Sequence, residues 1–477
     1  MKLRTKALWI LMGDGGAKLF GLLATLLLAR TFGVESYGEI TYALSILGIA
    51  GLFTDMGLHT LGTRNSALQI QFSGSPEAQN GPSSLFWLRI LLAISVFAIF
   101  FPIIWVKFAG QPQLRMLTLL FLISVVPQAL QTEWHFRGTQ RFRWYSLSRW
   151  IQSLTYLIGL LLLAQTRSVT IVPVIFSVSI LFAVLFQWAG YKPLHELFRR
   201  PRITAWKKLI RSGIYLTAGS FLFQTVILLP PILMELRFSL YELGLFGAMF
   251  KIILAAMIAD RVFTTLLLPN LAVLHQQPNA DIAGEIRPIV VWMLFFGLMG
   301  SIFLTFLASG LTGLLFGEQY LTGAAGLPIL SLFLPVTFVN SVYLFGLISA
   351  GRDQSYLQAG VRGGLVAVVF MAAGALSGSY TVFLLSLPLA EAAITYVVYR
   401  SYRQTIPATF PIRAWRLVLV YLPIAGLGIT VLDLNDAGLT ANNLVVALLA
   451  LLLFIAGARA TGGISKEDLQ WLKRRVQ

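Results

Sequence analysis

The sequence predicts an all-α polytopic membrane protein. Of its 477 residues, 57% are hydrophobic and only 12% are charged, whereas soluble domains carry about 25% charged residues. Apolar stretches long enough to cross a hydrocarbon core of about 30 Å recur along the chain, separated by short breaks with glycine, proline or charge. A water-soluble fold of this size has no room to bury so much apolar surface. The composition therefore excludes a secreted enzyme, a disordered chain and a soluble nucleic-acid-binding protein.

About 14 apolar stretches are the predicted transmembrane helices. Each has about 18 to 25 residues, which is the length that a helix needs to cross a bilayer. The predicted spans are 7–30, 38–61, 84–106, 114–135, 145–165, 169–190, 212–235, 242–267, 288–308, 325–349, 356–377, 379–399, 416–433 and 441–458.

Lysine and arginine residues collect in alternate loops. With the N-terminus inside, the cytoplasmic side holds the basic residues before span one, the loop 191–211 between spans six and seven, and the basic tail. The positive-inside rule then places both termini in the cytoplasm, and the net charge of +17 reflects topology rather than a nucleic-acid partner. The opposite side holds only Arg30, Lys107, Arg115, Arg167 and Arg237.

The span pattern divides the chain into two six-helix lobes and a C-terminal extension. A shift of 206 residues places Phe32 and Gly38 over Phe238 and Gly244, in the turn between the first two helices of each half. This supports a 6+6 repeat. The predicted parts are an N-terminal lobe (1–190), a basic cytoplasmic linker (191–211), a C-terminal lobe (212–400), and helices 13 and 14 with a basic cytoplasmic tail (401–477).

Four segments of the chain form an ordered set of motifs. They are Ala-Arg-Thr-Phe-Gly-Val-Glu-Ser-Tyr-Gly at 29–38, Asp-Met-Gly-Leu at 55–58 with Arg64, Trp-His-Phe-Arg-Gly at 134–138 with Gln140, and Leu-Phe-Gly-Glu-Gln-Tyr at 315–320 with Ala324 and Leu330. In this order they resemble the polysaccharide and O-antigen flippases of the multidrug/oligosaccharidyl-lipid/polysaccharide (MOP) exporter superfamily. That resemblance implies two six-helix, MATE-like bundles around a central cavity that opens to one membrane face at a time. It also implies a polyprenyl-diphosphate-linked oligosaccharide as cargo, moved from the cytoplasmic to the outer leaflet.

The same resemblance sets expectations for location and partners. We expect a bacterial inner-membrane protein that is functional as a monomer, contacts membrane lipid and a lipid-linked glycan, works with polysaccharide-assembly proteins and binds no nucleic acid. Some members of the family couple transport to an ion gradient, so H⁺ or Na⁺ is the expected coupling ion. No other cofactor and no bound metal are expected, because the chain has no cysteine and its four histidines lack metal-ligand spacing.

Cationic side chains inside the spans are the candidate cargo-binding residues. A diphosphate needs cations in a water-accessible cavity, and an intramembrane charge is costly without a partner or water. Lys251 is the leading candidate, because it lies deep in span eight without an acid three or four positions away. In the alternative interpretation Lys18 only forms an ion pair with Asp14 on the same helix face. The other cations then extend to the membrane surface or anchor helix ends. The candidates are Lys18, Arg30, Arg64, Arg89, Arg149, Lys251, Arg261 and Arg362.

Acidic side chains inside the spans are the candidates for ion coupling. Glu391 follows Pro388 by three residues, and a proline frees backbone carbonyls that can bind a cation. Asp55 and His59 share a helix face, and they either relay a proton or form a polar cap. The candidates are Asp14, Asp55, Glu133, Asp260 and Glu391.

The sequence thus predicts a flippase for cell-surface polysaccharide export that works by alternating access and is not an enzyme. Two alternatives stay open. The first is a drug or small-metabolite antiporter on the same fold, because cations favour anionic cargo whereas a cavity rich in acids favours cationic drugs. The second is a membrane glycan polymerase, against which the short outer loops argue.

Overall fold

The computed structural model confirms the all-α membrane fold. It describes residues 3–71, 81–163, 166, 168–192, 194–260, 281–405, 410–432 and 441–476, and every regular element within them is a helix. Ten helical segments among these residues are long and apolar enough to cross a membrane, and a shorter apolar helix covers 414–430. The exact number of fourteen spans is not confirmed.

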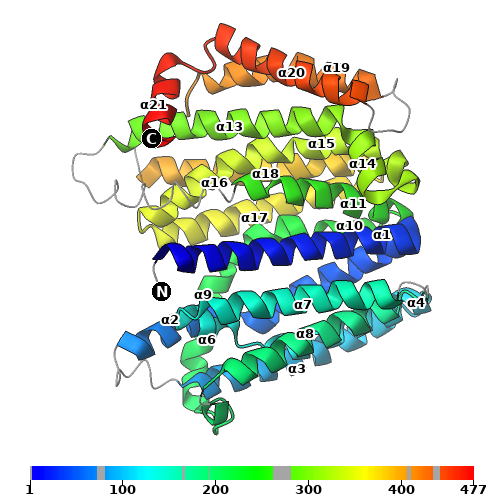
Figure 1. Cartoon of the computed structure of the whole chain (residues 1–477), viewed down its shortest axis with the longest axis vertical. Helices are drawn as coiled ribbons and strands as arrows, with labels where there is room; N and C mark the ends of the chain where they lie inside the picture. The colour runs from blue at the N-terminus through cyan, green and yellow to red at the C-terminus, as the bar shows by residue number, and fades with distance from the viewer. Residues whose placement is uncertain are drawn as a thin grey trace. The chain divides into compact units, whose positions relative to one another are not determined.

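The chain forms two compact units, residues 1–221 and 222–477 (Figure 1). The boundary lies inside one helix, α9 (Ile203–Leu228), so the linker 191–211 is wholly contained in the first unit. The other elements of the first unit are α1 (Leu3–Asp55), α2 (Leu58–Gln71), α3 (Pro82–Lys107), α4 (Pro112–Ile123), α5 (Val125–Ala129), α6 (Glu133–Gly138), α7 (Phe142–Leu163), α8 (Ile171–Gly190) and η2 (Leu194–Glu196).

Helix α1 contains the first predicted span and most of the second. The two runs meet at Gly33, where φ is 81° and ψ is 176°, a conformation that glycine adopts without steric cost. The second run ends at Asp55, because Met56 and Gly57 have positive φ values of 39° and 72°. The predicted end of that span at 61 is therefore wrong, and α2 is a separate helix.

Packing in the first unit brings helices from the beginning and the middle of its sequence together. Helix α1 packs along α7, and α7 packs along α8, as Figure 1 shows. A cluster of aromatic and aliphatic side chains is buried among α2, α3, α6, α7 and the linker, with Phe86, Trp134, Phe136 and Tyr145 among its members. The ends of α2, α6 and α7 are therefore held in fixed positions.

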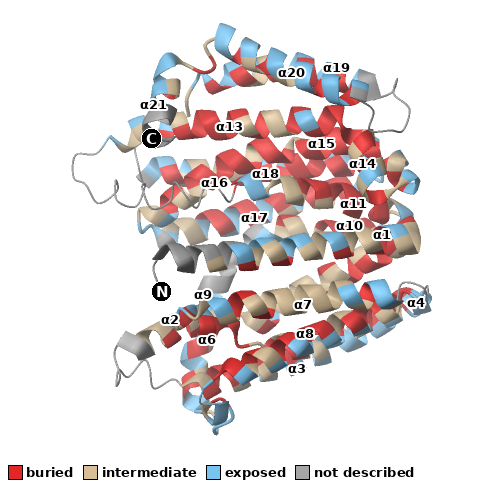
Figure 2. Ribbon diagram, in the orientation of Figure 1, coloured by how far each residue is buried: buried red, intermediate tan, exposed pale blue. Residues whose placement is uncertain are grey.

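The second unit is built around α13 (Ile282–Phe306), which packs against α15, α16, α19 and α20. Figure 2 shows that α13 and α16 are mostly buried, whereas α20 has a largely exposed side. Its other elements are α10 (Pro230–Glu235), α11 (Leu240–Ala256), α14 (Ala308–Phe316), η3 (Glu318–Gly326), α15 (Leu327–Ser331), α16 (Phe333–Ser349), α17 (Asp353–Leu376), α18 (Tyr380–Thr405), α19 (Ala414–Leu432), α20 (Ala441–Ala460) and α21 (Lys466–Val476).

Local sequence signals explain where several helices begin. Ser239 and Glu242 form a reciprocal capping box at the start of α11. Proline occupies the first turn of α3, α4, α10 and α15, where its missing N–H costs no hydrogen bond and its fixed φ suits the helix. These signals fix the helix entries that position the polar residues described next.

Candidate functional site

A break in the helix of predicted span four is the structural basis of the site in the first unit. The backbone between α5 and α6 is not helical, and side chains from α3 and α8 satisfy its polar groups. Arg89 donates to the carbonyl oxygens of Gln131 at 2.6 Å and Gln128 at 3.3 Å. The Thr132 N–H donates to Gln187 Oε1 at 2.6 Å. Irregular backbone at membrane depth needs such partners, because lipid offers no hydrogen bonds.

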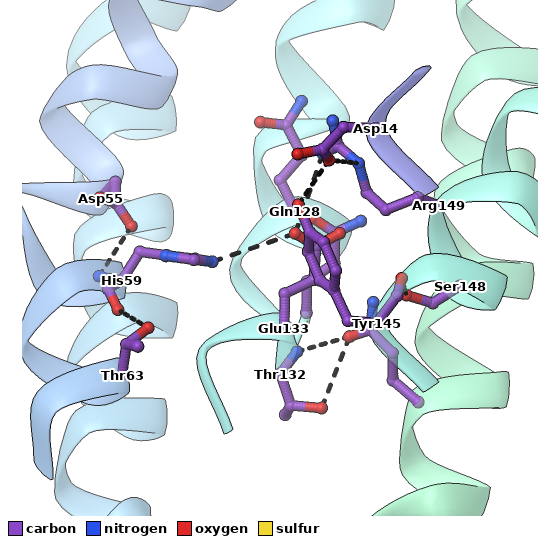
Figure 3. Close-up of polar contacts among 12 residues, drawn as sticks. Asp14, Asp55, His59, Thr63, Gln128, Thr132, Glu133, Tyr145, Ser148 and Arg149 are labelled. Carbon is purple, nitrogen blue, oxygen red and sulfur yellow. Dashed lines mark hydrogen bonds and ion pairs between the residues drawn. The ribbon is translucent and has the colours of Figure 1, made fainter. Parts of the chain in front are cut away.

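The break places Glu133, the first residue of α6, in the centre of a polar network (Figure 3). Its Oε2 lies 3.8 Å from Arg149 Nη1 and 4.0 Å from His59 Nε2. Arg149 Nε lies 4.0 Å from Asp14 Oδ1, which also accepts a 2.7 Å hydrogen bond from the Tyr145 hydroxyl. Helices α1, α2, α6 and α7 thus each contribute to one charged cluster.

Asp55 extends this cluster at the end of α1. Its Oδ1 accepts a 3.2 Å hydrogen bond from the His59 N–H and lies 3.9 Å from Arg89 Nη2. A carboxylate at the start of α2 satisfies a free backbone N–H and interacts favourably with the helix dipole. The contact agrees with the polar-cap alternative for this pair.

The two arginines of the cluster differ in accessibility. The Arg89 side chain is 7% exposed and bonded to backbone carbonyls, so its guanidinium supports the helix break. The Arg149 side chain is 37% exposed and lies between the carboxylates of Asp14 and Glu133. A ligand can therefore reach Arg149 without first displacing backbone contacts.

Lys18 is a further cation close to Asp14 in the sequence. It lies one turn beyond Asp14 on α1 and is exposed. It is 11 residues after the start of the predicted span 7–30 and 12 residues before its end, which corresponds to about 16 to 18 Å along the helix axis from either end. At mid-span an ammonium group cannot face hydrocarbon at low cost. We therefore infer water or polar groups around the Lys18 side chain.

The second unit holds a different cluster, in which two acids bind neighbouring residues of α16. Asp260 accepts a 2.7 Å hydrogen bond from the Ser341 hydroxyl. Glu391 on α18 accepts from Asn340 Nδ2 at 3.0 Å and from the Thr337 hydroxyl at 3.2 Å. Both acids are buried, and all three of these donors are uncharged. Asn340 Oδ1 has no hydrogen-bond partner among the described residues, so another acceptor oxygen lies beside the Glu391 carboxylate.

The other predicted cargo-binding cations lie elsewhere. Lys251 is partly buried on α11 and makes no hydrogen bond or ion pair with another described residue. Three further cations are exposed: Arg30 on α1, Arg64 on α2 and Arg362 on α17. Arg261 lies outside the described residues.

Uncharged polar residues complete both clusters, and the sequence analysis did not single them out. Gln131 donates to Gln152 at 3.0 Å beside the helix break, and Gln187 accepts from the backbone there. In the second unit Asn340 donates a hydrogen bond to Glu391, and Ser341 donates one to Asp260. In the sequence these residues are recognisable as amides and hydroxyls within apolar runs, because a polar group there needs a hydrogen-bond partner.

Comparisons with known proteins support the family and the fold. Residues 3–275 match the family model described as polysaccharide biosynthesis protein. A solved structure of the lipid II flippase MurJ in an inward closed conformation aligns with a TM-score of 0.72 at 15% identity, covering 94% of this chain and 98% of that chain. An inward-facing multidrug resistance MATE family transporter of the MOP superfamily aligns with a TM-score of 0.70 at 13% identity, covering 82% and 94%.

A third solved structure shares the fold. It is a MOP superfamily transporter from Pyrococcus furiosus, described as having a binding pocket of reverse polarity, and it aligns with a TM-score of 0.57 at 15% identity over 84% of this chain and 94% of that chain. No curated protein matches the chain. Because the family model matches more than half of its length, the chain belongs to the polysaccharide biosynthesis protein family, and it has the fold of MOP superfamily transporters.

Proposed function

We propose that the protein is a flippase that moves a polyprenyl-diphosphate-linked oligosaccharide from the cytoplasmic to the outer leaflet of a bacterial inner membrane. Family membership supports a role in cell-surface polysaccharide export, and the fold supports a carrier that works by alternating access. Both termini would be cytoplasmic, and the monomer would be sufficient. The observation that carries the anionic cargo class is that two accessible cations, Lys18 and Arg149, lie beside a single accessible acid, Asp14, which is one helical turn from Lys18 and 4.0 Å from Arg149.

The geometry around Arg149 supports a step in which a phosphate group of the cargo replaces the carboxylates of Glu133 and Asp14 as the partner of its guanidinium. Close guanidinium–carboxylate hydrogen bonds have heavy-atom distances of about 2.7 to 2.9 Å. Arg149 instead lies 3.8 Å from Glu133 and 4.0 Å from Asp14, so both carboxylates orient it without saturating its five N–H donors. A diphosphate offers more acceptor oxygens in a geometry that suits guanidinium. In this proposal Arg149 and Lys18 bind the diphosphate of the cargo.

The acids of the second unit support ion coupling. Asp260 and Glu391 interact electrostatically, and their α16 donors carry no charge. Two carboxylates that are close together in a low-dielectric site favour binding of a proton or a metal cation between them. We assign H⁺ or Na⁺ uptake to this pair, with the free acceptor oxygen of Asn340 as an additional ligand. No other cofactor enters the proposal.

Transport by proteoliposomes tests the cargo class. Purified protein is reconstituted with a fluorescent polyprenyl-diphosphate oligosaccharide, and label protected from external reagents is measured with and without an imposed ion gradient. We expect transport by the wild type and by Arg143→Ala, a control that removes an exposed cation of the same unit. Lys18→Ala should transport at least tenfold more slowly at low cargo concentration, because it loses a phosphate partner.

The alternatives give distinct results in the same vesicles. Exchange of a lipophilic cation for H⁺ or Na⁺, without transport of the diphosphate lipid, would replace the flippase by an antiporter. Acceptor-dependent lengthening of the glycan would show a polymerase. Equal transport by the wild type and Lys18→Ala would keep the flippase and remove Lys18 from the cargo site.

A further inference from the structure

The linker 191–211 has one face fixed against the first unit. Leu197 and Leu209 are 0% and 4% exposed, and they belong to the same apolar cluster as Trp134. Trp206 Nε1 donates to the Ser84 carbonyl oxygen at 2.9 Å, and the Ser84 hydroxyl accepts from the linker backbone at 2.9 Å. The linker is thus a docked surface element rather than a free tether.

The other face of the linker combines apolar side chains with cations. Leu194, Phe198 and Ile203 are 36%, 45% and 68% exposed. A single acid, Glu196, lies among them. We call this surface the basic-apolar face, and its exposed cations are Lys192, Arg199, Arg200, Arg202, Lys207, Lys208 and Arg211.

Its position in the chain places this face at the membrane surface. The apolar span α8 ends at Gly190, directly before the linker, and α9 begins at Ile203 within it. The excess of lysine and arginine indicates the cytoplasmic side. Anionic headgroups of the cytoplasmic leaflet attract basic residues at this depth, and neighbouring apolar side chains insert between the lipids.

We propose that the basic-apolar face is a binding site for anionic phospholipids, with cations on the headgroups and Leu194 and Ile203 in contact with the acyl boundary. Docking on the first unit holds the cations in place before lipid arrives, so little side-chain and backbone freedom is lost on binding. Exposed apolar side chains beside seven cations match the surface of an anionic membrane, which offers negatively charged headgroups and an acyl boundary together. The inference is independent of cargo and of transport.

Lipid titration of the delipidated full-length protein tests the site. Binding of phosphatidylglycerol and phosphatidylcholine is measured in neutral detergent by native mass spectrometry, with thermal unfolding in parallel. The test variant replaces four linker cations by glutamine: Arg199→Gln, Arg200→Gln, Lys207→Gln and Lys208→Gln. The matched control replaces four exposed cations of the second unit: Arg352→Gln, Arg400→Gln, Arg403→Gln and Arg459→Gln.

The wild type and the control should bind phosphatidylglycerol about tenfold or more tightly than phosphatidylcholine. The linker variant should lose that preference while unfolding at the same temperature without lipid. The double variant Leu194→Ser/Ile203→Ser should bind both lipids more weakly and keep the preference. If the quadruple variant does not fold, Arg200→Gln/Lys207→Gln should lose part of the preference. Equal binding of both lipids by the wild type, or a preference that survives in the linker variants, would overturn the proposal.

Discussion

The two units stabilise buried acids in different ways. In the first unit the Glu133 carboxylate lies beside the guanidinium of Arg149 and the imidazole of His59. In the second unit the Glu391 carboxylate accepts hydrogen bonds from an amide and a hydroxyl. A cation partner balances the charge within the protein. Uncharged donors orient a carboxylate but leave its charge to be balanced by a proton or a metal ion from outside.

This difference suggests a division of roles. Arg149 is paired with Glu133 and Asp14, so an anion that enters must compete with these carboxylates for its guanidinium. In the proposed function the acids of the second unit bind a cation. Substitutions in the first unit would then affect cargo binding, and substitutions in the second unit would affect ion binding.

Arg89→Ala should have the largest effect on stability. It removes the donor of the Gln128 and Gln131 carbonyl groups at the helix break and the cation beside Asp55, which keeps the His59 N–H. Losing the partner of a buried polar group costs about 1 to 3 kcal/mol, and Arg89 serves two carbonyl groups. We expect a large loss of folded protein and a lower melting temperature in detergent. Arg143→Ala should melt like the wild type, and an unchanged melting temperature for Arg89→Ala would contradict its structural role.

Glu133→Gln should destabilise the first unit less. The substitution removes the charge that faces Arg149 and His59 but keeps a polar side chain at the start of α6. Because Arg149 retains Asp14 and is partly exposed to solvent, we expect a loss of about 1 to 3 kcal/mol. Denaturation in detergent measures it. The matched change Glu391→Gln provides the comparison, and a larger loss there would contradict the assignment of a cation partner to Glu133 and of uncharged donors to Glu391.

Gln187→Ala should cost about 1 kcal/mol, because hydrogen bonds inside membrane proteins have modest net strength. It leaves the Thr132 N–H at the break without its acceptor. Thermal melting of Gln187→Ala and of the double variant Arg89→Ala/Gln187→Ala shows whether the two side chains support the same break. Additive losses would indicate that they act independently.

Glu391→Gln should change stability least, by less than the roughly 1 kcal/mol that a single hydrogen bond contributes, because no hydrogen bond is lost. A glutamine carbonyl can still accept from Asn340 and Thr337, and the uncharged group no longer needs an external ion. Transport should proceed down a cargo gradient and cease to respond to an imposed ion gradient. A proteoliposome assay with and without the gradient checks this, and an unchanged response would remove Glu391 from the coupling site.

The sequence was sufficient for features that depend on local pattern. Apolar stretches predicted the membrane helices, and the expected break between spans one and two contains Gly33, where the backbone changes direction. These features were predictable because neighbouring residues determine them. The break at Met56 and Gly57 was not predicted, and in place of a shared helix face Asp55 and His59 have a hydrogen bond from the His59 backbone N–H across that break.

Features that depend on distant residues were not predictable. Asp14 meets Tyr145 and Arg149 through the packing of α1 on α7, which no local spacing encodes. The break before Glu133 has no glycine or proline between Leu130 and Thr132, and its partners come from α3 and α8. Arg89 and Arg149 therefore look alike in the sequence, as cations near span ends, whereas their surroundings in the structure differ.

The most direct test of the proposed division of roles is equilibrium binding of a labelled polyprenyl diphosphate oligosaccharide to purified wild type, Lys18→Ala and Glu391→Gln. We expect Lys18→Ala to weaken binding at least tenfold and Glu391→Gln to bind like the wild type. The opposite pattern, with normal binding by Lys18→Ala and lost binding by Glu391→Gln, would contradict the proposed division of roles.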